Sequence, residues 1–351
     1  MTRAGASAGM RKTGAGPVAA LVAVGVLLLG ACGGGAGAPS PASREPGVVT
    51  VPTGINPAGI AIGGGYLWVA NSGEGTVSKI DLRTDRPVAR IRVGDPAGLV
   101  GCESGSIHQT PHGDFRIRNC DLPKAVAFED GSVWAGKGDT KDLVRIDPRT
   151  DRIVATVPLG VEAWYIYPTD LGIWVSDWRT DTVVRVDPAT NRVVATIPDL
   201  PYGPTGMALA PGGLWVADSR ASVVTRIDPA TGRVVATVPV GPTPLPVVYA
   251  FGSIWVRNMN EGNGTVSRID PETNRVLANV DVGPEAGRDG LDSMAVFRGG
   301  LWVSGLYLEK IDPARNQVVV KNRHTSNFVT LGAGALWTVD IAYSVSRIAN
   351  P

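Results

Sequence analysis

The sequence has few of the residues from which metal centres and nucleophilic active sites are built. Its 351 residues include three Cys and three His, too few for a structural zinc module. No Gly-x-Ser-x-Gly elbow, phosphate-binding loop or dinucleotide fingerprint is present, and the three Gly at 63–65 precede a predicted strand, which indicates a hairpin turn. We therefore expect no cofactor, and the sequence assigns no catalytic residue and no metal ligand.

An excess of charge of one sign is also missing. Lys and Arg number 33 against 32 Asp and Glu, whereas nucleic-acid binders usually carry a basic stripe and a high pI. Hydrophobic residues make up 44% of the chain, enough to bury a core. The high counts of Gly (45) and Pro (27) favour turns and short strands over long helices.

No apolar run is long enough to span a membrane. The run at 18–29 would measure about 18 Å as a helix, against about 30 Å for a hydrocarbon core. Arg3, Arg11 and Lys12 precede it, and no acidic residue occurs before residue 32. This pattern is typical of a secretory signal peptide.

The end of this segment, Leu29-Gly30-Ala31-Cys32, resembles the lipobox of bacterial lipoproteins. The resemblance implies cleavage before Cys32, acylation of its thiol and a lipid anchor on the extracytoplasmic face of the bacterial cell membrane. The alternative is a chance Cys in an ordinary signal peptide. We expect a signal peptide at 1–31, a flexible Gly-, Ala-, Pro- and Ser-rich tether at 32–47 and a folded domain at 48–351.

A sevenfold repeat fills the predicted domain. A hydrophobic residue followed by Trp recurs seven times, and an Ile-Asp or Val-Asp pair follows six of these markers. The marker residues are Trp68, Trp134, Trp174, Trp215, Trp255, Trp302 and Trp337. The mean period is about 43 residues, as in propeller blades. The pattern predicts an all-β, seven-bladed β-propeller in which residues 48–52 supply the missing last strand of the seventh blade.

The Trp residues and the turns are given structural roles. Apolar residues flank each Trp on both strand faces, which favours packing between blades over an aromatic binding surface. The turns, such as Asp187-Pro-Ala-Thr-Asn191, open with a capping Asp and reach Asp, Asn or Gly at the fifth position, which predicts a left-handed residue and a bulged hairpin. Arg145, Arg226 and Arg268 precede turns and are expected to form ion pairs or to be solvated.

The repeat at 213–241 resembles the YVTN/YncE-type seven-bladed propellers and is similar to the streptogramin (virginiamycin B) lyase type. The lyase resemblance implies a catalytic His and a Glu-linked magnesium ion on the channel-mouth loops. His324 falls at the end of a predicted fourth strand, His108 and His112 lie in an insertion, and Glu261 has no His beside it. This departure argues against lyase chemistry.

Function is expected where the repeats differ, on the loops that enter each inner strand or follow each second strand. The residue ten positions before the marker Trp is different in every repeat, and further large or charged residues lie close to these positions in the sequence. The ten-residue positions are Ala58, Lys124, Trp164, Thr205, Leu245, Asp292 and Asn327, and the neighbours are Tyr165, Trp178, Arg179, Arg288 and Asp289. We predict a ligand-binding mouth formed by Lys124, Trp164, Tyr165, Trp178, Arg179, Arg288, Asp292 and Asn327; the alternative is an inert, solvated rim.

An insertion at about 97–122 interrupts the repeat between the first two blades. Cys102 and Cys120 bracket most of it, and in an exported protein they are expected to form a disulfide worth about 3 kcal/mol. The loop is either a lid over the mouth or a tolerated surface insertion. The spacing of His108 and His112 suggests a metal site, but Pro111 and Gly113 oppose a helix there, which favours an ordinary polar loop.

These observations predict a monomeric, non-catalytic recognition scaffold that binds a protein, peptide or glycan at the cell surface. Its other expected partner is the membrane, through Cys32, and no nucleic acid is expected. The alternative is a metal-assisted lyase or hydrolase that uses carboxylates such as Asp292 or Glu261.

The lipid anchor is tested by replacing Cys32 with Ala. The variant lacks the thiol that takes the lipid, so we expect it to leave the membrane fraction while the parent protein stays there. Cell fractionation with immunoblotting measures the distribution. Retention of the variant in the membrane would contradict acylation at this residue.

Overall fold

The computed structural model describes residues 47–94, 106–110, 113–117, 123–137, 140–259, 264–283, 293–326, 328–340 and 343–351, with backbone alone at 106–110 and 113–117. The chain divides into two units, Met1–Ser43 and Arg44–Pro351, and every described residue belongs to the second. The expected signal peptide, Cys32 and the tether up to residue 46 lie outside the described residues. No helix in the described ranges is long and apolar enough to cross a membrane.

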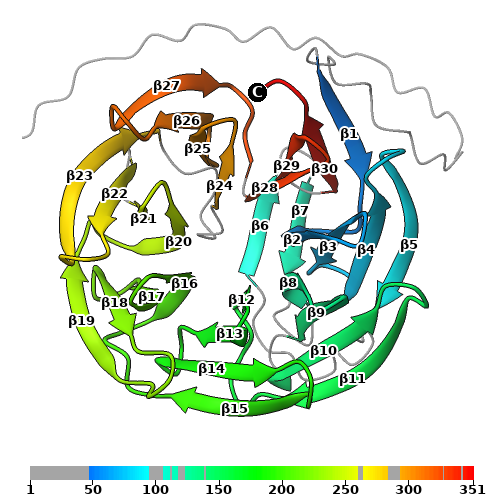
Figure 1. The fold of residues 1–351 in the computed structure, drawn as a ribbon. Helices are drawn as coiled ribbons and strands as arrows, with labels where there is room; N and C mark the ends of the chain where they lie inside the picture. The colour runs from blue at the N-terminus through cyan, green and yellow to red at the C-terminus, as the bar shows by residue number, and fades with distance from the viewer. Residues whose placement is uncertain are drawn as a thin grey trace, which may run out of the picture. The chain divides into compact units, whose positions relative to one another are not determined.

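Seven four-stranded antiparallel sheets follow one another around a ring, which confirms the predicted seven-bladed β-propeller (Figure 1). The inner strands are β2 (Pro57–Gly63), β8 (Pro123–Glu129), β12 (Tyr165–Thr169), β16 (Pro204–Ala210), β20 (Pro244–Ala250), β24 (Met294–Phe297) and β28 (Phe328–Gly332). The second strands are β3 (Tyr66–Asn71), β9 (Ser132–Lys137), β13 (Gly172–Asp177), β17 (Gly213–Asp218), β21 (Ser253–Asn258), β25 (Gly300–Val303) and β29 (Ala335–Val339). The third strands are β4 (Thr76–Asp81), β10 (Asp142–Asp147), β14 (Thr182–Asp187), β18 (Val223–Ile227), β22 (Gly264–Asp270), β26 (Leu308–Asp312) and β30 (Ser344–Ile348). The outer strands are β5 (Arg86–Arg92), β11 (Arg152–Pro158), β15 (Arg192–Ile197), β19 (Val234–Pro239), β23 (Arg275–Val282), β27 (Gln317–Asn322) and β1 (Val48–Pro52).

The ring closes through the first described strand. β1 pairs antiparallel with β30, from Val48 opposite Ile348 to Pro52 opposite Ser344. Val51 is 1% exposed and packs in a cluster with Trp337 of the seventh blade. The expectation that residues 48–52 complete the seventh sheet is confirmed, and this blade has four strands like the other six.

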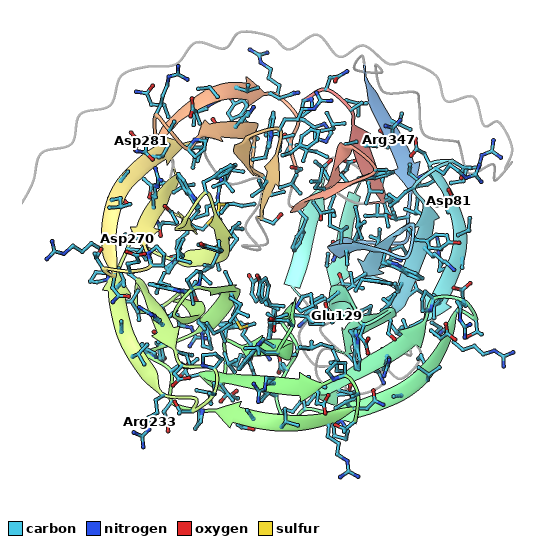
Figure 2. The ribbon with its side chains drawn as sticks, in the orientation of Figure 1. Asp81, Glu129, Arg233, Asp270, Asp281 and Arg347 are labelled. Carbon is cyan, nitrogen blue, oxygen red and sulfur yellow. The ribbon has the colours of Figure 1, made fainter. Side chains whose placement is uncertain are left out.

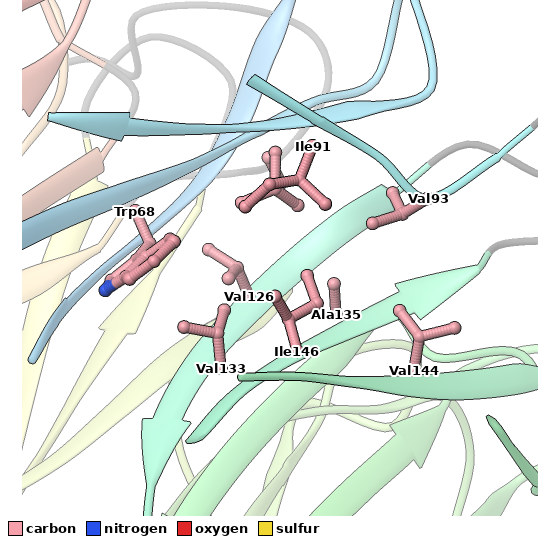
Figure 3. Close-up of a cluster of buried hydrophobic side chains, with 10 residues drawn as sticks. Trp68, Ile91, Val93, Val126, Val133, Ala135, Val144 and Ile146 are labelled. Carbon is pink, nitrogen blue, oxygen red and sulfur yellow. The ribbon is translucent and has the colours of Figure 1, made fainter. Parts of the chain in front are cut away.

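Each marker Trp packs against the following blade, as the packing interpretation predicted. All seven Trp side chains are at most 2% exposed. Trp68 of the first blade lies in one cluster with Val126, Val133 and Ile146 of the second (Figure 3). Trp337 of the seventh blade packs in turn with Leu67 of the first, so the core is a closed series of blade-to-blade contacts.

In every blade except the sixth, a cation on the third strand donates a hydrogen bond to the next blade. Arg145 lies 5.2 Å from the Trp134 ring centroid and donates to the Pro188 carbonyl (2.7 Å) and to Asn191 Oδ1 (3.2 Å) in the next turn. The same pattern links Lys79 to Pro148 and Asp151, Arg226 to Pro271 and Asn274, and Arg268 to Pro313 and Asn316. Arg145, Arg226 and Arg268 therefore bridge blades instead of pairing with the Asp two residues on, and Arg145 also forms an ion pair with Asp130 (3.9 Å) of its own blade.

The last two junctions use variants of this link. Lys310 donates to the Arg298 carbonyl (3.0 Å), and Arg298 donates to Asn350 Oδ1 (3.0 Å) in the seventh blade. Arg347 donates to Asp85 Oδ2 (2.9 Å) in the first blade and so joins the two ends of the ring.

The turns between third and outer strands have the predicted bulge and backbone. The register shifts after the cation in all six, for example between Arg145 and Ile146. The fifth turn residue has a positive φ in each, from 53° at Asn316 to 70° at Gly232. Arg233 and Asp270, which belong to two of these turns, lie at the outer edge of the ring (Figure 2).

The opening Asp of each turn has a lowered pKa because it accepts hydrogen bonds. In Asp81, Asp147, Asp228 and Asp312 the main cause of the lowered pKa is a backbone N–H two residues on. In Asp187 and Asp270 the main cause of the lowered pKa is the hydroxyl of the Thr three residues on. The predicted capping role of these Asp residues is confirmed.

The insertion between β5 and β8 contains a hairpin, whereas the sequence favoured an ordinary polar loop. β6 (Ser106–Thr110) pairs with β7 (Gly113–Ile117), so that His108 is opposite Phe115. The expected Cys102–Cys120 disulfide, the lid and the His108–His112 metal site depend on residues or side chains outside the described part.

Gly232 leaves the link from the third to the fourth blade incomplete. Arg185 reaches the Pro229 carbonyl at 3.4 Å, but Gly232 has no side chain to accept a second bond, and Arg185 Nε has no partner among the described residues. A Cβ on Gly232 would lie 3.4 Å from Ile197, an ordinary contact, and φ of Gly232 is 70°.

We expect Gly232→Asn to stabilise the ring, because the Asn side-chain oxygen would accept the missing hydrogen bond from Arg185. The expected gain is about 1 kcal/mol, which calorimetry would measure as a rise of about 2 °C in Tm.

Gly232→Ala is the matched control for this substitution. It adds the same Cβ at a positive φ without an acceptor, so we expect it to be destabilising. If Gly232→Asn were no more stable than Gly232→Ala, the side-chain oxygen would not be what strengthens the link.

Candidate ligand-binding site on the mouth face

Loops that enter the inner strands meet the loops that follow the second strands, as predicted. Ser219 N donates to the Gly203 carbonyl (2.8 Å) in the fourth blade, and Met259 N donates to the Thr243 carbonyl (3.1 Å) in the fifth. Equivalent bonds join Ser72 to Asn56 and Ser304 to Ser293. We call the side of the ring formed by these loops the mouth face.

The two Trp outside the marker set contact each other on this face. Trp164 precedes β12 and Trp178 follows β13, and the backbone N–H of Trp164 donates to the Ser176 carbonyl (3.3 Å). Their ring centroids are 5.4 Å apart at 80°, an edge-to-face geometry. Both are half-buried, unlike the marker Trp residues, and blade packing does not require them.

Lys124 and Arg179 lie on the same aromatic pair. Lys124 Nζ is 3.6 Å from the Trp164 ring centroid, and Arg179 Cζ is 5.5 Å and 5.6 Å from Trp164 and Trp178. Glu162 connects these groups, since it accepts from Trp164 Nε1 (2.8 Å) and from Arg179 (3.0 Å). Four of the predicted mouth residues are therefore brought together in one network.

Tyr202 and Arg220, neither of which was predicted from the sequence, extend this network into the fourth blade. Arg220 Cζ lies 4.5 Å from the Trp178 ring and 4.8 Å from the Tyr202 ring. Arg220 follows Trp215 by five residues, as Arg179 follows Trp174, so the repeat register could have identified it. We define the rim cluster as Lys124, Glu162, Trp164, Trp178, Arg179, Tyr202 and Arg220.

Asp177 holds the loop that carries Trp178 and Arg179. Its carboxylate accepts from the backbone N–H of Glu162 (3.0 Å) and of Arg179 (2.9 Å), and from the Thr180 hydroxyl (2.9 Å). The loop conformation is thus fixed by a buried acceptor with three donors.

The equivalent residue in the fourth blade, Asp218, is in a different state. It is 0% exposed, one oxygen accepts from the Thr225 hydroxyl, and Oδ1 has no partner among the described residues. Burial raises the pKa of Asp218 to about 7, with a smaller contribution from the charge of Asp181. Below neutral pH the carboxyl is therefore protonated.

Of the remaining predicted mouth residues, Tyr165 alone lies in the part of the chain that the structure describes. Tyr165 is the first residue of β12 and is half-buried. Three residues that were expected to line the mouth are buried: Ala58, Thr205 and Leu245. Each lies ten residues before a marker Trp, and this position falls among the first residues of an inner strand. Arg288, Asp289, Asp292, Asn327 and Glu261 lie outside the described residues.

His324 forms a pair that the sequence did not indicate. It follows β27 in the loop that enters β28, which belongs to the mouth face. Its Nε2 lies 2.9 Å from Thr338 Oγ1 and 3.3 Å from Asp340 Oδ1. No group of three or more His, Cys, Asp or Glu that could hold a metal ion occurs within the described ranges.

Comparison with known proteins supports the architecture. No protein-family model matches the sequence, and no curated protein matches it. Among solved structures, a chain of hydrazine synthase from Kuenenia stuttgartiensis is similar over 84% of this chain and 96% of its own length, with a TM-score of 0.64 and 14% identity. At that identity the likeness shows the fold alone.

Asp218 should make stability depend on pH. The pKa of Asp218 in the folded state, about 7, lies above the ordinary 3.8. The stabilisation of the folded state by this carboxyl is therefore full below about pH 4 and is lost as pH rises through 7. Asn71 and Asn258 occupy the equivalent position and donate to hydroxyls there. We expect Asp218→Asn to melt close to the parent protein at pH 4 and several degrees above it at pH 8.

Asp177→Asn is the control. Its amide replaces an acceptor that three donors require, so we expect a lower melting temperature at both pH values. An Asp218→Asn melting difference that did not grow with pH would show that Asp218 is ionised in the fold.

Proposed function

We propose that the protein is an exported, lipid-anchored β-propeller that acts as a non-catalytic recognition scaffold and binds a protein, peptide or glycan of the cell surface through the rim cluster. The resemblance of residues 29–32 to a lipobox supports export and anchoring. The remainder of the proposal rests on the mouth face.

The observation that carries the proposal is the contact between Trp164 and Trp178. Large aromatic side chains that remain partly exposed, beside charged groups, are enriched in recognition surfaces. Here they lie on loops that break the sevenfold repetition, while the repeated residues serve the blade junctions. A rigid ring with one irregular aromatic sector suits recognition, because little conformational entropy is lost on binding.

Binding is tested with full-length protein and isolated cell-envelope material. Trp178→Ala removes one ring of the pair and the support of two guanidinium groups, so we expect at least a tenfold loss of affinity with little change in Tm. Biolayer interferometry measures the affinity.

Phe251→Asn is the matched control for an exposed aromatic residue. Phe251 is 39% exposed on the turn after β20, on the opposite face, and Asn tolerates its φ of 52°. We expect this variant to bind as the parent does. Equal binding by Trp178→Ala and the parent would refute the proposed site.

A metal-assisted lyase or hydrolase is the second candidate, and the His324–Asp340 pair is the observation that favours it. A His oriented by a carboxylate is a common acid–base arrangement. Metal analysis of the purified protein separates the two candidates: a stoichiometric divalent ion, together with turnover that is lost in His324→Ala, would favour the enzyme.

A further inference from the structure

Arg220 is held in a fixed orientation on the mouth face. Its backbone N–H donates to the Tyr202 carbonyl (3.2 Å), and its guanidinium lies near both Trp178 and Tyr202. Gly203 lies beside its aliphatic stem, where a Cβ would come within 3.2 Å of Arg220 Cγ. The absence of a side chain at Gly203, which also has φ 72°, leaves room for this stem.

The guanidinium of Arg220 differs from the other arginines in this sector. Arg179 is paired with Glu162, and Arg226 donates to the next blade. Arg220 is exposed, and in the described part of the chain its guanidinium donates no hydrogen bond and has no carboxylate within ion-pair distance. Five N–H donors are therefore available to a ligand.

Planar two-oxygen anions fit these donors. A guanidinium stacked on aromatic rings keeps its edge for ligands, and the edge binds a carboxylate through two parallel N–H···O bonds. Because stacking has already fixed the side chain, little rotamer entropy is lost on binding.

The neighbouring acids restrict the charge of the ligand. Glu162, Asp177 and Asp181 belong to the same group of loops, and each has oxygens that accept hydrogen bonds from this sector. A polyanion would be repelled by these groups, whereas a single carboxylate finds one open cation.

Tyr202 indicates what accompanies the carboxylate. Its side chain is 48% exposed beside Arg220, and an exposed aromatic ring next to polar donors suits the C–H face of a sugar. We propose that Arg220, Trp178 and Tyr202 form a subsite for a uronic acid unit, with the carboxylate on the guanidinium and the pyranose ring against Tyr202. The proposal rests on the proposed recognition function and specifies its ligand class.

Methyl glucuronide is the probe for this subsite, with methyl glucoside as its neutral counterpart and inorganic phosphate as a plain anion. Calorimetric titration of the full-length protein should show glucuronide binding at least tenfold tighter than glucoside or phosphate. Arg220→Gln should lose that difference, and Arg220→Lys should keep part of it, since Lys retains the charge without the planar fork. Arg233→Gln, on a turn of the opposite face, should bind as the parent does.

Equal glucuronide affinity in Arg220→Gln and the parent, or no glucuronide binding by the parent, would overturn the proposal. Phosphate binding as tight as glucuronide binding would overturn the assignment to a sugar. In each case, loss of envelope binding in Trp178→Ala would still support the recognition function. Failure of the uronic acid subsite can therefore be distinguished from failure of the recognition function. Thermal melts of the variants establish that each is folded.

Discussion

The structure depends on a cation that lies on a Trp of its own blade and donates to a turn of the next. Arg145 and Arg268 show this link most completely, since each also donates through Nε to a Ser of its own blade. The Trp supplies buried area, and the cation fixes the distance and rotation between neighbouring sheets. A ring of seven sheets needs its junctions to have similar geometry, and a repeated side-chain pair provides it at most of them.

This link explains two features of the sequence at once. The fifth turn residue must accept a left-handed backbone, which permits Asp, Asn and Gly. It also serves as an acceptor for the preceding blade, a requirement that Asp and Asn meet and Gly does not. Asn191 and Gly232 are thus equivalent for the backbone but not for the junction.

The fold could be predicted from the sequence because its determinants are local and repeated. The Trp marker, the Asp-initiated turn and the strand at 48–52 each have a near neighbour in the chain or a clear copy in another repeat. Contacts between blades were harder to foresee, since Arg145 and Asn191 are 46 residues apart. Arg145 was therefore assigned to an ion pair or to solvent, although it bridges two sheets.

The candidate site could be predicted only in part. Trp164 and Trp178 were identified because nothing in the repeat accounts for them, and Lys124 and Arg179 followed from their positions. Tyr202 and Arg220 were missed because the importance of Arg220 comes from the rings on either side of it, one from each of two loops. The raised pKa of Asp218 was equally hidden, since Asp177 has the same sequence position and has three donors.

The strand that closes the ring also determines where a pulling force from the N-terminal side acts on it. Residues before Gly47 join the propeller through β1, whose ladder with β30 begins at Val48 opposite Ile348. A pull applied from that side reaches this pair first, before any other strand of the ring. The first part of the ring to bear such a force is thus one short strand, which is held by its ladder with β30 and by the burial of Val51.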